Sequence, residues 1–223
     1  MSFLEDNKNI GLLVLIVGIM TIVAAIVLVA WISGHKVAGY TTAGTIVSLV
    51  GALISGIIFI LAGLSVRDSK DDQLGLLQMF AGMIGLKIAY DIKIGIPALL
   101  VMVMGITSLI NGVFAIIAGG VNGSVGAGIS AGIIGIIIGI FFLIAAPIVA
   151  GNKKSSSGSI IWIILLILTV LGILGSFFAL FVVFIIPIYG LFVLIVAICS
   201  LLLYIFLLLA FLSPEIKKTM GVD

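Results

Sequence analysis

Six apolar runs follow one another along the chain, each long enough for a helix to cross a bilayer. A helix needs about 20 apolar residues to cross a hydrocarbon core of about 30 Å. The runs are 10–33, 42–66, 95–118, 124–150, 159–184 and 189–212. Backbone polar groups inside lipid must be satisfied within each segment, so helices are the expected spanning form. The pattern predicts an all-α polytopic transmembrane bundle of six spans.

The fifth and sixth runs are nearly continuous, and we place their boundary at 186–190. Pro187 removes a helix donor and Gly190 tolerates a turn, so a tight hairpin is expected there. The basic residues test this division. With six spans, nine of the ten share the side of the two termini and Lys36 alone lies on the other, whereas fusing the two runs gives seven against three. The positive-inside rule then predicts that both termini are cytoplasmic.

The segment 67–94 is the only long connection between the spans. It begins with the polar run Arg-Asp-Ser-Lys-Asp-Asp, and the thirteen residues 74–86 that follow it are too few to cross a bilayer. Lys87 and Lys93 come next, which suits a helix lying in the cytoplasmic interface. Two interpretations stay open: a linker that keeps two hairpins apart, or a regulatory or partner-docking element.

Composition excludes several classes of protein. Hydrophobic residues make up 64% of the chain and charged residues 8%, and the mean hydropathy is +1.57. Soluble domains carry about 25% charged residues, so this chain could not cover a core with a wetted surface. A soluble enzyme, a nucleic-acid binder and a disulfide-built secreted domain are therefore not expected. The amino-terminal residues lack the features of a secretory signal, so the first run is expected to be a retained helix.

The chain contains 28 glycines, and many recur at seven-residue steps within the runs. Small residues on one helical face let backbones approach, which is what holds helices together in lipid. We expect helix packing at Gly18, Gly51, Gly105, Gly112, Gly128, Gly132, Gly135, Gly139 and Gly172. This predicts a tight bundle or an oligomer with little room for a wide pore. A narrow glycine-lined pathway is the alternative.

The apolar runs also repeat in pairs. Leu-Leu-Val followed by Gly-Ile occurs at 12–19 and again, with the same spacing, at 99–106. The second run of each pair matches as well, because 56–62 parallels 139–145. The repeating unit is a two-helix hairpin, and its copies share one orientation, unlike the inverted repeats of many secondary transporters.

Six spans, hairpin repeats, Leu-Leu-Val-x-x-x-Gly-Ile openings and glycine-rich second helices resemble the HdeD-like membrane proteins. The resemblance is clearest over 10–150. It implies a role in acid resistance and envelope stress, and no functional residue carries over with it. The long charged segment 67–94 and the scarcity of prolines near helix ends depart from the family pattern.

The spans offer little chemistry. They contain no Asp, Glu, Lys, Arg or His, which argues against a proton-coupled pump or a carboxylate cation site. Asn111 is the only amide in a span, and it either bridges helices by hydrogen bonds or lines a pathway. His35 and Cys199 are single residues of their kinds and too few for a zinc site. No catalytic residue, metal or cofactor is expected, and 126–131, a relaxed dinucleotide-binding pattern, lacks the preceding strand.

Three hypotheses for function follow. The first is a non-enzymatic protein of the cell membrane that acts in envelope maintenance or stress and acid tolerance. The second is an accessory subunit that docks a membrane protein partner through 67–94 or its apolar flanks. The third is a channel or facilitator for a small solute, using the helix faces around Asn111. Expected partners are the lipid bilayer and either a second copy of the chain or another membrane protein, and not nucleic acid.

Overall fold

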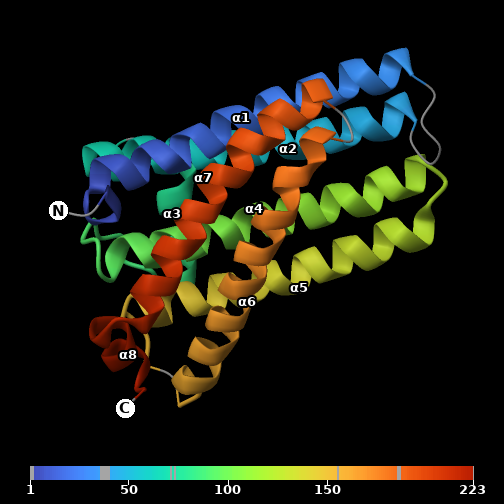
Figure 1. The fold of residues 1–223 in the computed structure, drawn as a ribbon. Helices are drawn as coiled ribbons and strands as arrows, with labels where there is room; N and C mark the ends of the chain where they lie inside the picture. Colours follow the sequence, from blue (N-terminus) through green and yellow to red (C-terminus); the bar gives the residue numbers. More distant parts are fainter. Residues whose placement is uncertain are drawn as a thin grey trace.

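The computed structural model describes residues 3–35, 41–70, 72, 74–154, 156–184 and 187–222. The helices are α1 (Asn7–Gly34), α2 (Thr42–Asp68), α3 (Leu76–Ile84), α4 (Gly95–Val121), α5 (Val125–Val149), α6 (Gly158–Ala179), α7 (Pro187–Leu212) and α8 (Pro214–Met220), with 3-10 helices at Phe3–Glu5 and Leu180–Phe184 (Figure 1). The described residues contain no strand. Six helices are long and apolar enough to cross a membrane. The all-α, six-span prediction is confirmed, and the chain is an integral membrane protein.

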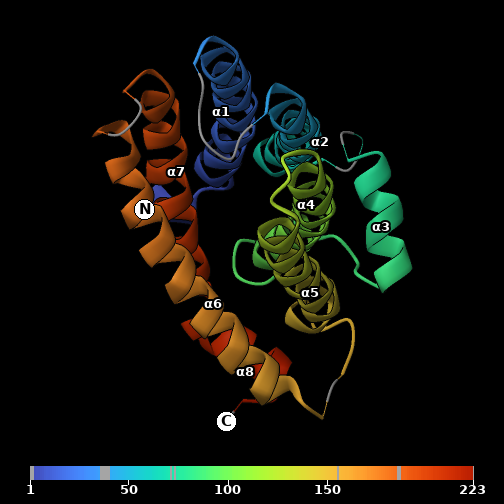
Figure 2. The ribbon, with the colours of Figure 1, turned by 90° about the vertical axis from the view of Figure 1, so that its right-hand side faces the viewer.

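The six long helices form three hairpins. Helices α1 and α2 pack along each other, as do α4 and α5, and the two pairs meet where α2 contacts α4. The third pair, α6 and α7, is attached through α7, which packs on α1. Figure 2 shows α6 and α7 on one side of the bundle and α3 on the opposite side. The result is a close-packed group of four helices with a third hairpin at its flank.

The helices differ from the predicted spans mainly at their ends. Helix α1 begins at Asn7, before the apolar run, because the Asp6 side chain accepts a hydrogen bond from the Lys8 backbone N–H and caps the helix. The α-helix of the fifth span ends at Ala179, and the chain continues as a 3-10 helix through 184. Pro187 opens α7, where a proline is tolerated because the first helical N–H has no helical acceptor. Lys36, Ile186 and Asp71 lie outside the described residues.

Glycines stand where helices come close together, both within a hairpin and between the first two hairpins. At Gly18, a β-carbon would lie 2.6 Å from the carbonyl oxygen of Gly56 on α2. At Gly51 it would lie 3.0 Å from the side chain of Phe114. At all nine glycines singled out above, the added carbon would lie 3.1 Å or less from an atom of a neighbouring helix. That these contacts hold the bundle together stays a prediction, which the stability of glycine variants tests.

The segment 67–94 folds against one end of the bundle. Its central part is α3, which buries Leu77 and Ala81 against the other helices and exposes Leu76 and Met83. One apolar face is therefore covered by protein and another is not. An amphipathic element of this kind suits the membrane interface, and this location stays a prediction.

Hydrogen bonds tie the rest of this segment to three other parts of the chain. The Asn7 side-chain amide donates to the Tyr90 carbonyl oxygen at 2.8 Å, and the Lys87 backbone N–H donates to the Asn152 side-chain oxygen at 2.7 Å. The Ser65 hydroxyl donates to the carbonyl oxygen of Lys70. The connection between the first two hairpins is therefore anchored at both of its ends.

An ion pair between Lys93 and Glu215 adds a further tie, from this segment to α8. The hydrogen bond from Lys93 lowers the pKa of the Glu215 carboxyl below its ordinary value. A lowered folded-state pKa gives stability that is present above the ordinary pKa and lost as the pH falls through the lowered one. We expect the contact to loosen only below about pH 4. Amide hydrogen exchange over 91–95 and 213–217 measures this.

The Glu215→Gln variant is the control, because it removes the charge at every pH. It should show at neutral pH the faster exchange that the wild type reaches only in acid. Equal exchange of wild type and Glu215→Gln at both pH values, after correction for the intrinsic rate, would contradict the prediction. The pair is exposed, so the effect is expected to be local and small.

The first and last described residues lie at the same end of the bundle, as Figure 1 shows. This agrees with an even number of spans, and the side of the membrane stays a prediction from the basic residues. A reporter fused after Asp223 should be cytoplasmic, and one inserted after His35 should face outward. The reverse result would overturn the assignment of sides.

Candidate functional site: uncharged cavities along α7

A series of cavities follows α7, and neighbouring cavities share its residues. The distal cavity lies between α1, α2 and α7, has a volume of about 310 Å³ and includes Val193 and Val196. The hairpin cavity, between α6 and α7, is also about 310 Å³ and contains the same two valines with Ser200 and Tyr204. The central cavity is about 130 Å³ and shares Ser200 and Tyr204. The side cavity is about 310 Å³, shares Tyr204 and reaches Phe211.

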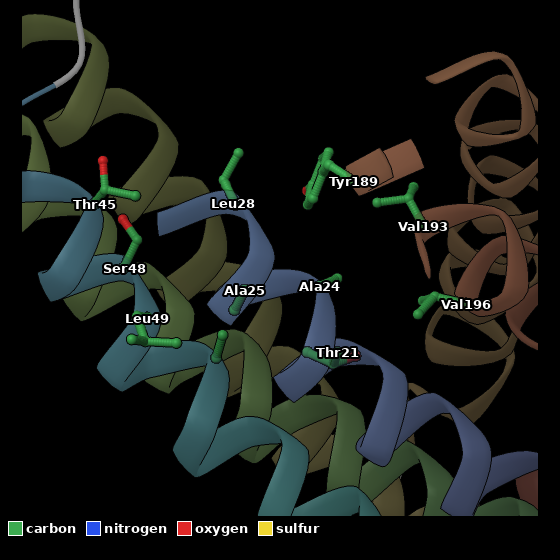
Figure 3. Close-up of a pocket in the computed structure, with 11 residues that line it drawn as sticks. Thr21, Ala24, Ala25, Leu28, Thr45, Ser48, Leu49, Tyr189, Val193 and Val196 are labelled. Atoms are coloured by element: carbon green, nitrogen blue, oxygen red, sulfur yellow. The ribbon is translucent and has the colours of Figure 1, made fainter. Parts of the chain in front are cut away.

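The distal cavity is largely apolar. Figure 3 shows Tyr189 and Val193 of α7 opposite small and apolar side chains of α1 and α2, among them Leu28. The polar groups of α2 in its wall are satisfied by their own helix or its cap: the Thr45 hydroxyl donates to the Thr41 carbonyl oxygen at 2.8 Å, and that of Ser48 bonds similarly. Apart from these two residues, and from Thr21 of α1 and Tyr189 of α7, the wall is apolar.

The central cavity is different, because hydroxyl groups from two helices meet there. Ser108 of α4 lines it together with Ser200 and Tyr204 of α7, and the apolar wall includes Phe59 and Phe142. In the part of the chain that the structure describes, no hydrogen bond reaches any of these three hydroxyls. All three side chains are half-buried and belong to membrane-spanning helices. A polar group away from water is costly without a hydrogen-bond partner, so three unmatched hydroxyls around one cavity call for an explanation.

The side cavity continues from the central one toward the flank of the bundle. It shares Met104, Ser108, Phe142 and Tyr204 with the central cavity. Its other walls are mainly apolar and come from α4, α5, α6 and α7. Leu171, one of its lining residues, has an exposed fraction of 56%, whereas Phe211 at the other limit is 1% exposed. The side cavity therefore reaches the surface on α6 and is closed toward the end of α7.

Tyr204 is placed by a glycine. A β-carbon at Gly172 would lie 2.6 Å from the Cζ atom of the Tyr204 ring, so the ring lies directly on the α6 backbone. The glycine pattern predicts packing at Gly172, but neither motif nor spacing in the sequence indicates a site at Tyr204, Ser108 or Ser200. One signal was available: tyrosine in membrane proteins is enriched at the two interfaces, and Tyr204 lies inside the last span.

Asn111 joins two hairpins. Its side-chain oxygen accepts a hydrogen bond of 3.2 Å from the Ser55 hydroxyl, linking α4 to α2. The contact corresponds to the helix-bridging role, one of the two roles expected for this residue. Asn111 is exposed and lies about one turn from Ser108 on the same face of α4. A pathway role for Asn111 stays a prediction.

The remaining candidate groups lie apart from one another. His35 lies at the end of α1 and stacks on Trp31, with ring centroids 5.1 Å apart. Its Nδ1 atom lies 2.9 Å from the carbonyl oxygen of Trp31. Cys199 is buried in α7. No group of three or more His, Cys, Asp and Glu side chains that could hold a metal ion occurs among the described residues. The four cavities described above have no charged residue in their walls.

The arrangement can bind uncharged groups that form hydrogen bonds, because transferring a charge into such an environment is costly unless it is paired. The resemblance to HdeD-like proteins rests on motifs between 10 and 150, and the hydroxyls of Ser200 and Tyr204 lie outside that range. No family model, no curated protein and no solved structure matches the chain.

Proposed function

We propose that this protein is a non-enzymatic membrane protein that binds a small uncharged molecule in the cavities along α7. The observation that supports this most strongly is the meeting of three unmatched hydroxyls, those of Ser108, Ser200 and Tyr204, at the central cavity. These three side chains lie half-buried within membrane-spanning helices, and a polar group left unsatisfied away from water costs about 1–3 kcal/mol. A bound molecule with its own hydrogen-bonding group recovers part of that cost for each hydroxyl it reaches.

The walls restrict the charge and size of the ligand. They are lined by aliphatic, aromatic, hydroxyl and glycine residues, so an ion would lose its hydration without gaining a counter-charge. Pockets for drug-sized ligands have volumes of about 300–1,000 Å³. Each cavity of about 130–310 Å³ lies below or at the lower end of this range. A small molecule, or a slender one that occupies adjoining cavities, fits best.

Native mass measurement in lipid nanodiscs tests the proposal. The wild type should carry additional mass from a small molecule after gentle extraction, or gain it from a panel of added neutral compounds. Ser200→Phe, which fills the junction of the central and hairpin cavities, should lose this mass. Ser130→Phe on the exposed face of α5 is the matched control and should retain it. A wild type that binds nothing, or equal binding by Ser200→Phe, would contradict the proposal.

A facilitator for a small solute is a second candidate, because a series of cavities that share lining residues extends along α7 from Tyr189 to Phe211. Reconstituted vesicles should then pass a neutral solute faster than empty vesicles, and Ser200→Phe should remove the difference. The envelope-stress role implied by the resemblance stays a separate proposal, as does docking to a membrane protein partner. Unchanged survival of a deletion strain in acid would count against the envelope-stress role. Extraction that always yields the protein alone would count against docking to a membrane protein partner.

A further inference from the structure

We infer that the bound molecule is an uncharged amphiphile, with a hydroxyl or carbonyl head in the central cavity and a hydrocarbon tail in the side cavity. The inference rests on the proposed function and names its ligand class. It follows from the different character of two cavities that share four residues, Met104, Ser108, Phe142 and Tyr204.

The central cavity suits the head. A hydroxyl group can both donate and accept, so Ser108, Ser200 and Tyr204 match an alcohol, an ester or a ketone. The cavity's volume of about 130 Å³ is well above the roughly 10–15 Å³ that one water molecule requires. Thr107 also lines it, but its hydroxyl already donates to the Val103 carbonyl oxygen at 2.9 Å. Three hydroxyls are therefore available to one head group.

The side cavity suits the tail. Its wall beyond the shared residues is aliphatic and aromatic, and its additional hydroxyl, that of Thr169, donates to the Leu165 carbonyl oxygen at 2.7 Å. It therefore presents apolar surface to a chain and no further unmatched polar group. About 310 Å³ accommodates a hydrocarbon chain of moderate length.

The side cavity also offers a route from the bilayer. Leu171 of α6 and Ile138 of α5 both line it, and both side chains are at least partly exposed. Among the long helices in the described residues, α6 packs closely only against α7, so α5 and α6 are not sealed together. A tail that enters between α5 and α6 brings the head to the hydroxyls without crossing the closed end at Phe211.

Photolabelling of the full-length protein in nanodiscs tests this inference. The probe is a twelve-carbon alcohol with a diazirine near the end of its chain. Labelling should be saturable, and the modified residues should lie in 168–171 of α6 or 207–211 of α7. Excess dodecanol and the methyl ester of dodecanoic acid should compete, and dodecyl phosphate, which is charged, should not.

Three conservative variants address the head group directly. Tyr204→Phe keeps the ring and removes its hydroxyl, and we expect roughly threefold to tenfold weaker binding of the probe, the range for loss of one neutral hydrogen bond. Adding Ser108→Ala and Ser200→Ala should weaken binding further. Ser130→Ala, whose hydroxyl faces away from both cavities and bonds the Ala127 carbonyl oxygen, is the control and should bind as the wild type does.

The possible failures can be told apart. If saturable labelling occurs but the triple variant binds as tightly as Ser130→Ala, the head position is wrong, and the proposed function stands as long as Ser200→Phe loses the bound mass. Equal competition by dodecyl phosphate would contradict both this inference and the uncharged ligand of the proposed function. Labels confined to surfaces away from α6 and α7 overturn the tail position. If the wild type shows neither saturable labelling nor any bound mass from the neutral panel, the proposed function itself fails.

Discussion

Replacing Gly112 with leucine should destabilise the protein by about 3 kcal/mol, the upper part of the usual range for overpacking. The added β-carbon would lie 2.7 Å from the Gly132 carbonyl oxygen and 2.9 Å from the Ile136 backbone nitrogen. Both are backbone atoms of α5, so relief requires the whole helix to move. Because Gly112 is near the middle of α4, we expect the α4–α5 hairpin to be separated along much of its length.

Gly120→Leu is the matched control for this variant. Gly120 lies on the same helix, and a β-carbon there has no atom within 4 Å that would obstruct it. Both variants replace a glycine of α4 by leucine, and only Gly112 meets the α5 backbone, so the difference between them reports mainly the contact with α5. Unfolding in bicelles by heat or by added denaturing detergent measures the two stabilities. Equal stability of Gly112→Leu and Gly120→Leu would show that glycine packing does not hold this hairpin together.

Replacing Gly172 with leucine should abolish binding at the central cavity while leaving most of the stability. The added β-carbon would lie 2.5 Å from Cε1 of Tyr204 and 2.6 Å from Cζ. These are side-chain atoms, so the ring can move while the helix stays in place, at a cost of about 1 kcal/mol. Displacement carries the tyrosine hydroxyl away from Ser108 and Ser200. We expect ligand affinity to fall at least tenfold.

A double variant separates the two effects of this change. In a Tyr204→Ala background the obstructing ring is gone, so adding Gly172→Leu should cost less stability there than it does in the wild type, whereas binding should not return. Nanodisc binding and bicelle unfolding on the same preparations give both quantities. Binding by Gly172→Leu at wild-type affinity would remove the positioning role of this glycine. An equal loss of stability from Gly172→Leu in the wild type and in Tyr204→Ala would show that leucine is opposed by something other than the Tyr204 ring.

The connection 67–94 illustrates where sequence analysis reached its limit. Its charged start and short apolar stretch predict that it lies outside the six spans, because thirteen residues cannot cross a bilayer. In the structure α2 extends to Asp68 and α3 has nine residues. Its hydrogen bonds to Asn7 and Asn152 could not be predicted. They join positions more than 60 residues apart, and neither a periodic pattern nor a composition indicates such a pairing.

The candidate site shows the same division more sharply. The sequence contains Ser108, Ser200 and Tyr204 in separate apolar runs, where each hydroxyl could have bonded to its own helix, as those of Thr107 and Thr169 do. Only the packing of α7 against α1 brings the α7 hydroxyls toward α4 and leaves a cavity between them. The glycine pattern predicts a close contact at Gly172, but it does not indicate that the Tyr204 ring is the group that makes this contact.

The sequence by itself determined the class of the protein, its six spans and the uncharged character of its interior. These follow from run length and composition, since each spanning helix satisfies its own backbone hydrogen bonds. The tertiary structure decided which faces meet, where α6 and α7 attach and which hydroxyls lack partners. The physical reason is that lipid is as apolar as the side chains it surrounds. Hydropathy therefore cannot distinguish a face that contacts another helix from one that contacts the bilayer, and shape alone makes that choice.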